Sequence, residues 1–347
     1  AVSDRAPAPP ATRSLAQVMD RHVAWQETGT GPGHALSLPA LFAVVRLIAS
    51  NIDQLDLTVD GGTVPDWLRL PRSTGGALDQ GDLIQYTVSE MALRGKAFWL
   101  AERTGEGWRL NAVHHGSVGV QASSFGTVGL SYTFNGEPIE RLSYNGYGQE
   151  RALIHIPYLV TADAPQGTSP AVETWPSIAG YLAVEKQAAT LLDGGTHSGG
   201  RLETDHDITA ESARRYRDQW IENRRQGKIP VLGAGLRYAN DVISPRDATW
   251  IESRQANAMQ VASMYGIPNS MLSLSLAGGA SSLSYSNSQD NNRLFRVNAL
   301  EAFTSQIEDA ISPLLRAPGR NGGEEQRIRF DYTEWEAAAN ATPDTDA

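Results

Sequence analysis

Apolar residues recur three and four positions apart in several long segments, which is the pattern of helices that bury one face. The first such segment predicts a helix over residues 37–54, with Ser37 as N-cap and Pro39 in the first turn. A second helix is expected over 80–94, with Gly95 as the residue that ends it. The face of the first helix that we expect to be buried consists of Leu38, Leu41, Phe42, Val45, Ile48, Ala49 and Ile52.

Between residues 97 and 157 the pattern changes to short β-type runs, several of them separated by Gly or Asn-Gly turns. The Asn135-Gly136 pair is the strongest hairpin signal among them. With the two helices before them, these runs predict an α+β region of about 120 residues with its own core. The predicted strands are 55–60, 97–102, 108–113, 118–121, 129–134 and 152–156.

The rest of the chain is mainly helical in pattern. We expect helices over 171–192, 209–225, 248–265 and 288–315, and short strands at 229–232, 236–239 and 326–332. Thr209 with Ser212 forms a partial cap signal, while Gly266 and Pro268 stop the third helix. The residues expected on the buried face of the last helix are Leu294, Val297, Leu300, Phe303, Ile307, Ile311 and Leu314.

Composition narrows the class of protein. The 347 residues include no cysteine, which excludes disulfides and cysteine zinc sites and favours assembly in the cytosol. No apolar run approaches the ~20 residues of a membrane helix, and the Pro/Ala-rich start does not resemble a signal peptide, so no membrane association is expected. The formal net charge of −10 is unlike that of proteins that grip nucleic acid through its phosphates. Such a chain can still surround DNA.

Motifs for catalysis or cofactor binding are missing from the sequence. It contains no phosphate-binding Gly-x-x-x-x-Gly-Lys-Ser/Thr, no His-Glu-x-x-His and no calcium loop. His114 and His115 would point to opposite faces of a strand, so we do not expect them to share a metal. Thr196–Gly200 is faintly similar to a hydrolase elbow, but a helix precedes it where a strand is needed. We therefore expect no catalytic, cofactor or metal site, and keep a serine hydrolase using Ser198 only as an alternative.

Two further segments are unusual. A run of arginines on the helix over 209–225 could contact phosphates, but acidic neighbours nearly cancel it, which favours a solvated helix or one paired with a neighbouring subunit. A neutral loop of Ser, Gly, Ala and Leu at 273–286 connects two well-defined helices, and long loops inside compact domains are usually functional or disordered.

At this point the order of features resembles the HK97-type portal proteins of tailed bacteriophages. The resemblance is carried by 251–255, by the helix end Val261–Leu272 with its Tyr-Gly-Ile-Pro turn, by Tyr285-Ser286-Asn287, and by Leu314-Leu315. Upstream, four further segments resemble family motifs in the same order: 43–49, 93–98, 154–156 and 167–170. Lys96 stands where the family usually has Asn.

The resemblance implies an α+β portal fold with a wing, a two-helix stem, a small α/β clip, a tunnel loop followed by a long helix, and a reduced crown. Its segments would be an N-terminal arm, partly disordered, at 1–36, the wing at 37–168, stem helices at 169–195 and 245–266, the clip at 196–244, the tunnel-loop region at 267–287, the long helix at 288–316, and a C-terminal strand with an acidic tail at 317–347.

The same resemblance implies a non-enzymatic homo-oligomeric ring, a dodecamer in this family, at the capsid portal vertex of the virion. It would be assembled in the host cytoplasm and would conduct double-stranded DNA during packaging and ejection. Its partners would be the major capsid protein, the terminase and then the head–tail adaptor; another capsid or connector component is the alternative. The implied tunnel-loop residues are Ser273, Ser275, Gly278, Gly279, Ser281, Ser282 and Tyr285, and the implied clip contacts are Arg214, Arg217, Trp220 and Arg224.

Overall fold

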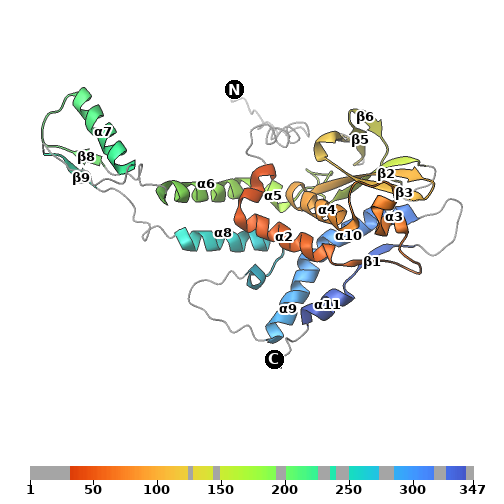
Figure 1. Ribbon diagram of the computed structural model, residues 1–347. Coiled ribbons are helices and arrows are strands. Elements are labelled where there is room, and N and C mark those ends of the chain that lie inside the picture. Colours follow the sequence, from red (N-terminus) through yellow and green to blue (C-terminus); the bar gives the residue numbers. More distant parts are fainter. Residues whose placement is uncertain are drawn as a thin grey trace, which may run out of the picture. The chain divides into compact units, whose positions relative to one another are not determined.

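The computed structural model describes residues 32–123, 128–143, 149–192, 201–225, 235–239, 250–272, 285–315 and 326–340. The chain forms two compact units, and the second is inserted into the sequence of the first. Unit 1 consists of the residues up to Trp175 and from Ala258 onward, and unit 2 consists of Pro176–Asn257. Figure 1 shows the elements of both units along the chain.

Two helices form one layer of unit 1. A 3₁₀ turn, η1 (Pro32–Ser37), leads into α2 (Pro39–Asp53), and α4 (Gln80–Arg94) packs against α2. The N-cap of α2 is Leu38, so the prediction of Ser37 was wrong: Pro39 at the first helical position sets the start. The predicted buried position Phe42 is also wrong, since its side chain is 52% exposed. Gly95 ends α4 with φ 78°, as predicted.

Antiparallel strands form the second layer. One sheet has the order β3 (Gly107–Val113), β2 (Lys96–Thr104), β7 (Arg151–Pro157), and the other has β4 (Val118–Ala122), β5 (Leu130–Phe134), β6 (Glu137–Ile139). A shared apolar cluster includes Phe98 and Leu153 from the first sheet and Tyr132 from the second. Asn135 and Gly136 both have positive φ, so the predicted hairpin turn is confirmed, and β6 after it is a strand that the pattern did not reveal.

Strands from the N-terminal and C-terminal parts of unit 1 pair with each other. Strand β1 (Asp56–Val59) pairs antiparallel with β10 (Ile328–Asp331), and Leu57 faces Phe330 in this register. A helix, α11 (Thr333–Asn340), follows where the sequence predicted only an acidic tail. Two short turns, α3 (Asp66–Arg69) and η2 (Pro71–Thr74), connect β1 to α4. Pairing between strands about 270 positions apart therefore closes unit 1.

The helix predicted over 288–315 is interrupted. It consists of α9 (Tyr285–Phe295), a π-helical turn η5 (Arg296–Leu300), α10 (Glu301–Ile311) and a 3₁₀ turn η6 (Ser312–Leu315). α10 packs against β7 and β10. The predicted buried positions Leu294 and Val297 are wrong, because their side chains are 50% and 51% exposed. The buried stripe instead passes through Phe295 and Ala299, four residues apart, and Leu294 lies nine residues, about two and a half helical turns, before the buried Phe303.

Unit 2 contains most of α6 (Trp175–Leu192), the strand pair β8 (Arg201–Glu203) and β9 (Arg237–Ala239), α7 (Ala210–Arg225), and the first turns of α8 (Trp250–Met264). Strand β8 lies in a stretch for which the sequence predicted no strand. The backbone N–H of Ser212 donates to Thr209 Oγ1, which confirms the predicted cap. In Figure 1, α7 lies beside the β8–β9 pair. The predicted strand over 229–232 lies outside the described residues.

Candidate functional site: the root of the two-helix insertion

The chain leaves unit 1 through α6 and returns to it through α8, and the residues that hold these two ends form a tightly built site. We call this site the root. A short helix, α5 (Pro170–Glu173), precedes α6, so the helix predicted over 171–192 is broken at Thr174. The Thr174 hydroxyl donates to the Pro170 carbonyl oxygen at 2.7 Å, and its oxygen lies 3.4 Å from the Met264 sulfur, which places the start of α6 beside the last residue of α8.

The backbone on the entry side of the root is in direct contact with the end of α4. A Cβ atom on Gly95 would collide with the carbonyl carbon of Thr168, and one on Gly167 would collide with the carbonyl oxygen of Gly95. Both glycines have positive φ. The N–H of Tyr158 donates to the same Gly95 oxygen at 2.8 Å. Only glycine allows this close approach, which explains two of the glycines in the family-like segments.

Hydroxyl groups then organise the start of α5. Ser169 Oγ accepts from the N–H of Val172 at 3.3 Å, and Pro170 occupies the first helical position. Thr168 Oγ1 donates to Glu173 Oε1 at 2.6 Å. The Gly-Thr-Ser-Pro segment, given above only as resembling a family motif, is therefore a helix N-terminus built from local chemistry.

On the return side, Tyr265 anchors the end of α8. Its ring is 1% exposed and its hydroxyl donates to the carbonyl oxygen of Ala92 at 2.9 Å. Burial raises the pKa of Tyr265, so the phenol stays protonated and able to donate. Gly266 follows with φ 70°, and a Cβ there would lie 2.6 Å from the Asn298 oxygen. The Tyr-Gly-Ile turn is thus held from two sides, by α4 and by η5.

A buried histidine, His155, forms hydrogen bonds next to the entry side of the root. His155 is 2% exposed and stacks on Phe98, with ring centroids 5.0 Å apart. Its Nε2 lies 2.9 Å from the Gln166 carbonyl oxygen, which can only accept, so Nε2 carries the proton. Nδ1 then accepts from the Tyr132 hydroxyl at 3.0 Å. Burial lowers the pKa of His155 to about 3, so the ring is neutral.

Lys96 lies at the start of β2 and is the other titratable group in this region. Burial lowers the pKa of Lys96 to about 8, because the ammonium group loses water around it. The register pairs Lys96 with Pro157, two positions from His155. Burial therefore disfavours the charged form of both groups on the entry side.

The residues predicted for the clip are spread along α7. Arg214 and Arg217 are exposed, and Arg217 forms an ion pair with the adjacent Asp218 at 2.8 Å. Trp220 is half-buried. Asp205, one of the acidic residues expected to offset the arginines, instead forms an ion pair with Arg237 at 3.6 Å. The side chain of Arg224 lies outside the described residues.

Most of the predicted tunnel loop lies outside the described residues. This applies to Ser273, Ser275, Gly278, Gly279, Ser281 and Ser282, and also to Ser198 of the alternative hydrolase site. Tyr285 is the first residue of α9. The described flanks are a 3₁₀ turn, η4 (Asn269–Leu272), which follows the Tyr265 anchor, and α9 itself. The segment is therefore preceded by η4 and followed by α9, and both elements belong to unit 1.

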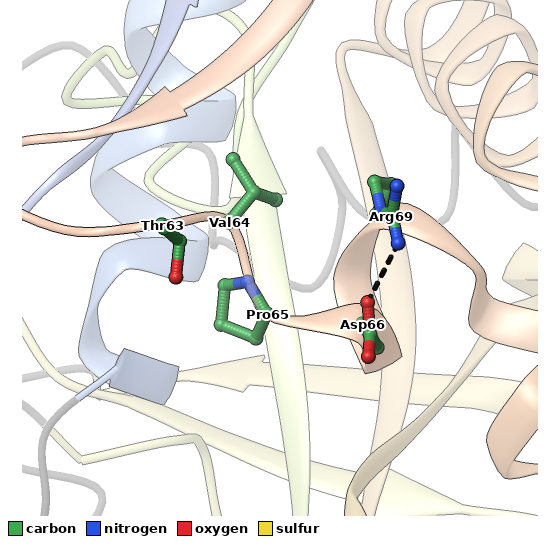
Figure 2. Close-up of a pocket in the computed structure, with 5 residues that line it drawn as sticks. All are labelled: Thr63, Val64, Pro65, Asp66 and Arg69. Carbon is green, nitrogen blue, oxygen red and sulfur yellow. Dashed lines mark hydrogen bonds and ion pairs between the residues drawn. The ribbon is translucent and has the colours of Figure 1, made fainter.

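The two cavities described below lack a pair of groups that could catalyse a reaction. One of about 490 Å³ is lined by Thr63, Val64, Pro65, Asp66 and Arg69, and Figure 2 shows its two charged groups paired with each other. A neighbouring cavity of about 450 Å³ includes Trp67 and Trp108 in its lining. Neither brings a nucleophile together with a base, so the described residues form no catalytic constellation at these cavities.

The paired histidines of the described part of the chain lie at a turn rather than on a strand. Our reason for separating His114 from His115 was wrong: β3 ends at Val113, and the two rings lie with centroids 4.2 Å apart at the turn η3 (His115–Ser117). Among the described residues, no three His, Asp or Glu side chains form a group that could hold a metal ion. No described helix is both long and apolar enough to cross a bilayer.

The sequence model of the family described as phage portal protein matches residues 39–342, which include both units and the root. The chain belongs to the phage portal protein family. The predicted resemblance is thereby confirmed, and this portal chain is a member of a family of structural proteins.

Relatives of the portal chain agree with this assignment. A probable portal protein of Streptomyces phage phiC31 is 25% identical over 311 residues, which are 82% of this chain and 65% of that protein. The chain thus spans about two thirds of that relative's length. The crystal structure of an HK97 family phage portal protein from Corynebacterium diphtheriae matches with a TM-score of 0.65 at 15% identity, covering 89% of this chain and 98% of that one.

A chain in the neck of a native gene transfer agent particle, solved with C12 symmetry, matches with a TM-score of 0.56 at 20% identity. It covers 90% of this chain and 91% of that one. A chain in the neck of the empty particle, solved with C6 symmetry, matches with a TM-score of 0.57 at 19% identity. These likenesses confirm the predicted mixed α and β portal fold.

Sequence reasoning found part of the root of this portal protein. The Gly-Thr-Ser-Pro and Tyr-Gly-Ile-Pro segments carried a turn signal, and Gly95 carried a helix-stop signal. The partners of Tyr265 and Thr174 were missed, because they lie 173 and 90 positions away and nothing local marks them. The buried pairing of His155 with Tyr132 was missed for the same reason.

Proposed function

We propose that the chain is a subunit of a homo-oligomeric ring, a dodecamer, that forms the DNA channel at the portal vertex of a tailed-phage capsid. The observation that carries this proposal is the family match over residues 39–342. The C12 symmetry of the structurally similar neck supports the ring. The channel would conduct double-stranded DNA into the capsid during packaging and out of it during ejection, without a catalytic site, a cofactor or a metal.

The two units suggest how the parts of the portal are divided. We assign the wing to the α+β part of unit 1, the stem to α6 and α8, and the clip to the described parts of unit 2 around α7, β8 and β9. The root is then the part of unit 1 from which the stem helices start, held by the contacts at Gly95, Thr168 and Tyr265.

The negative charge of the chain supports a channel that does not bind DNA tightly. Twelve copies at −10 each carry about −120 formal charges, so the walls of the ring would repel phosphate groups rather than bind them. The segment 273–285 would be the tunnel loop, and its small neutral residues would make weak contacts with DNA. Low friction suits a channel that DNA must cross quickly.

The partners follow from the same assignment. The exposed arginines of α7, Arg214 among them, would belong to the surface that meets the terminase during packaging and the head–tail adaptor afterwards. The wing would contact the major capsid protein. Assembly would take place in the host cytoplasm, and the mature location would be the virion.

Electron microscopy and native mass spectrometry of the purified chain test the proposal. We expect closed rings with an open central channel. A chain that stays monomeric under every assembly condition, including incubation with its capsid and terminase partners, would overturn it. Shortening 273–284 should leave the ring intact and reduce packaged DNA. Normal packaging by that variant would remove the tunnel assignment.

A further inference from the structure

Two large apolar side chains on the helix after residues 273–284 are exposed without an evident reason. Leu294 of α9 is 50% exposed and Val297 of η5 is 51% exposed, and three positions separate them, so they lie on one side of the helix. Phe295 and Ala299 occupy the opposite, buried side. We call Leu294, Val297 and the exposed Asp290 one turn earlier the α9 surface.

The buried stripe of the helix leaves this surface outside. The buried positions Phe303, Ile307 and Ile311 of α10 continue backwards, four residues at a time, to Ala299 and Phe295. Leu294 lies nine residues before Phe303, so the helical repeat places it off that stripe, and Val297 lies within the π turn Arg296–Leu300. Arg296 stabilises the turn through ion pairs with Glu301 and Glu336 and lies over the Tyr332 ring, 4.4 Å from its centroid. The exposure is thus built into the fold.

A second exposed apolar residue lies on another side of unit 1. Phe42 of α2 is 52% exposed, and Arg46, one turn later on the same side, is also exposed. Asn51 of α2 accepts a hydrogen bond from Trp335 of α11 at 2.8 Å, and Trp335 packs near Phe295 of α9. Asn51 and Phe42 are nine residues apart, about two and a half helical turns, so they point in opposite directions. We call Phe42 and Arg46 the α2 surface; it faces away from α9 and α11.

The two surfaces complement each other in charge. Asp290 lies one turn before Leu294, and Arg46 lies one turn after Phe42. Neither charge forms an ion pair with another described residue. One surface therefore offers an apolar pair with an unpaired carboxylate beside it, and the other offers an aromatic ring with an unpaired guanidinium beside it.

We propose that the α9 surface of one copy packs against the α2 surface of the next copy in the ring, with Asp290 facing Arg46. This inference rests on the proposed ring. A ring needs a heterologous contact between two different patches on opposite sides of each subunit. An apolar centre with a charged pair at its rim is the arrangement that gives such a contact its affinity and its orientation.

Cross-linking tests the contact directly, because the chain contains no cysteine. The double variant Phe42→Cys with Val297→Cys should form disulfides between copies on mild oxidation and give a ladder of covalent oligomers. The matched control pairs Leu70→Cys with Val297→Cys, since Leu70 is 54% exposed but lies on neither surface. Equal ladders from both variants would overturn the proposal, as would no ladder from the first variant in a sample that contains rings.

Charge reversal supplies an independent test. Asp290→Arg and Arg46→Asp should each weaken ring formation, on the order of tenfold in subunit affinity, because each places like charges opposite one another. Combining them should restore ring formation. A double variant that assembles no better than the single variants contradicts the pairing.

The reactivity of a single thiol separates this contact from the ring itself. Rings of the single variant Val297→Cys whose thiol reacts with maleimide as fast as that of the free subunit would overturn this contact and leave the ring standing. A wild-type chain that never assembles would overturn the proposed function and this contact together.

Discussion

The hydroxyl of Thr174 lies 3.4 Å from the sulfur of Met264, and these residues are 90 positions apart in the chain. The whole of unit 2 is inserted between them. The contact holds together the point where the chain leaves unit 1 and the point where it returns. Tyr265 and Gly266, directly after Met264, attach the same point to α4 and η5.

Replacing Gly95 with alanine should prevent stable folding. The new Cβ would collide with the Thr168 backbone, which cannot move away as a flexible side chain could. The control is Gly61→Ala, because Gly61 has a similar φ of 66° and nothing within 4 Å of the added atom. That control should cost only the left-handed backbone penalty, about 1–2 kcal/mol. Urea denaturation followed by circular dichroism measures both, and similar losses would contradict the close approach.

Tyr265→Phe should destabilise the protein by about 1–3 kcal/mol, because the Ala92 carbonyl would lose its donor inside the core. The variant keeps the ring and its packing, so the loss reports the hydrogen bond alone. Tyr216→Phe is the control, since Tyr216 lies on α7 and its hydroxyl makes no hydrogen bond with a described residue. The midpoint of urea unfolding should fall for the first variant and stay unchanged for the second.

His155 should make the protein less stable in acid. Its folded pKa of about 3 lies below the unfolded value of about 6.5, so the unfolded chain binds the extra proton between these values. The free energy of unfolding should therefore fall as the pH drops from about 6 to 4, by at most about 1.4 kcal/mol per pH unit from this group. His155→Gln should be less stable at pH 7 and show a shallower pH dependence. An unchanged slope would show that the ring is not held neutral.

Lys96 should make the stability of the protein depend on pH in the alkaline range. Its folded pKa of about 8 lies below the unfolded value of about 10.4, so the unfolded chain again binds more protons between these values. This contribution makes the protein more stable as the pH rises from about 8 to 10. Lys96→Met should be more stable than wild type at pH 7, with the difference shrinking towards pH 10. Chemical denaturation at four pH values would measure it.

Several parts of this fold were predictable because their signals are local. Gly95 and Gly266 end helices through their own backbone freedom, and the Asn135-Gly136 turn sets its own hairpin. The periodicity of α4, α7 and α8 located these helices to within a few residues. The Gly-Thr-Ser-Pro helix start belongs to this class, and it supplied half of the root.

Other parts depended on contacts that the sequence does not display. Hydrophobicity placed Phe42 and Leu294 inside, yet both are half exposed. The buried stripe of α10 continues through Ala299 and Phe295, and Leu294 lies about two and a half helical turns before Phe303, off that stripe. The pairing of β1 with β10 was hidden because the two strands lie about 270 positions apart and each is only four residues long.

The sequence by itself determined the positions of most helices and strands, the absence of cysteine chemistry, the negative charge and the family. Each of these depends on residue identity or on neighbours within a few positions. Only the tertiary structure decided that Tyr265 bonds to Ala92, that His155 is a neutral buried link, and that Leu294 and Val297 face outward. These features arise when segments far apart in the chain pack together, because packing selects which face of a helix is covered and which polar groups lose water.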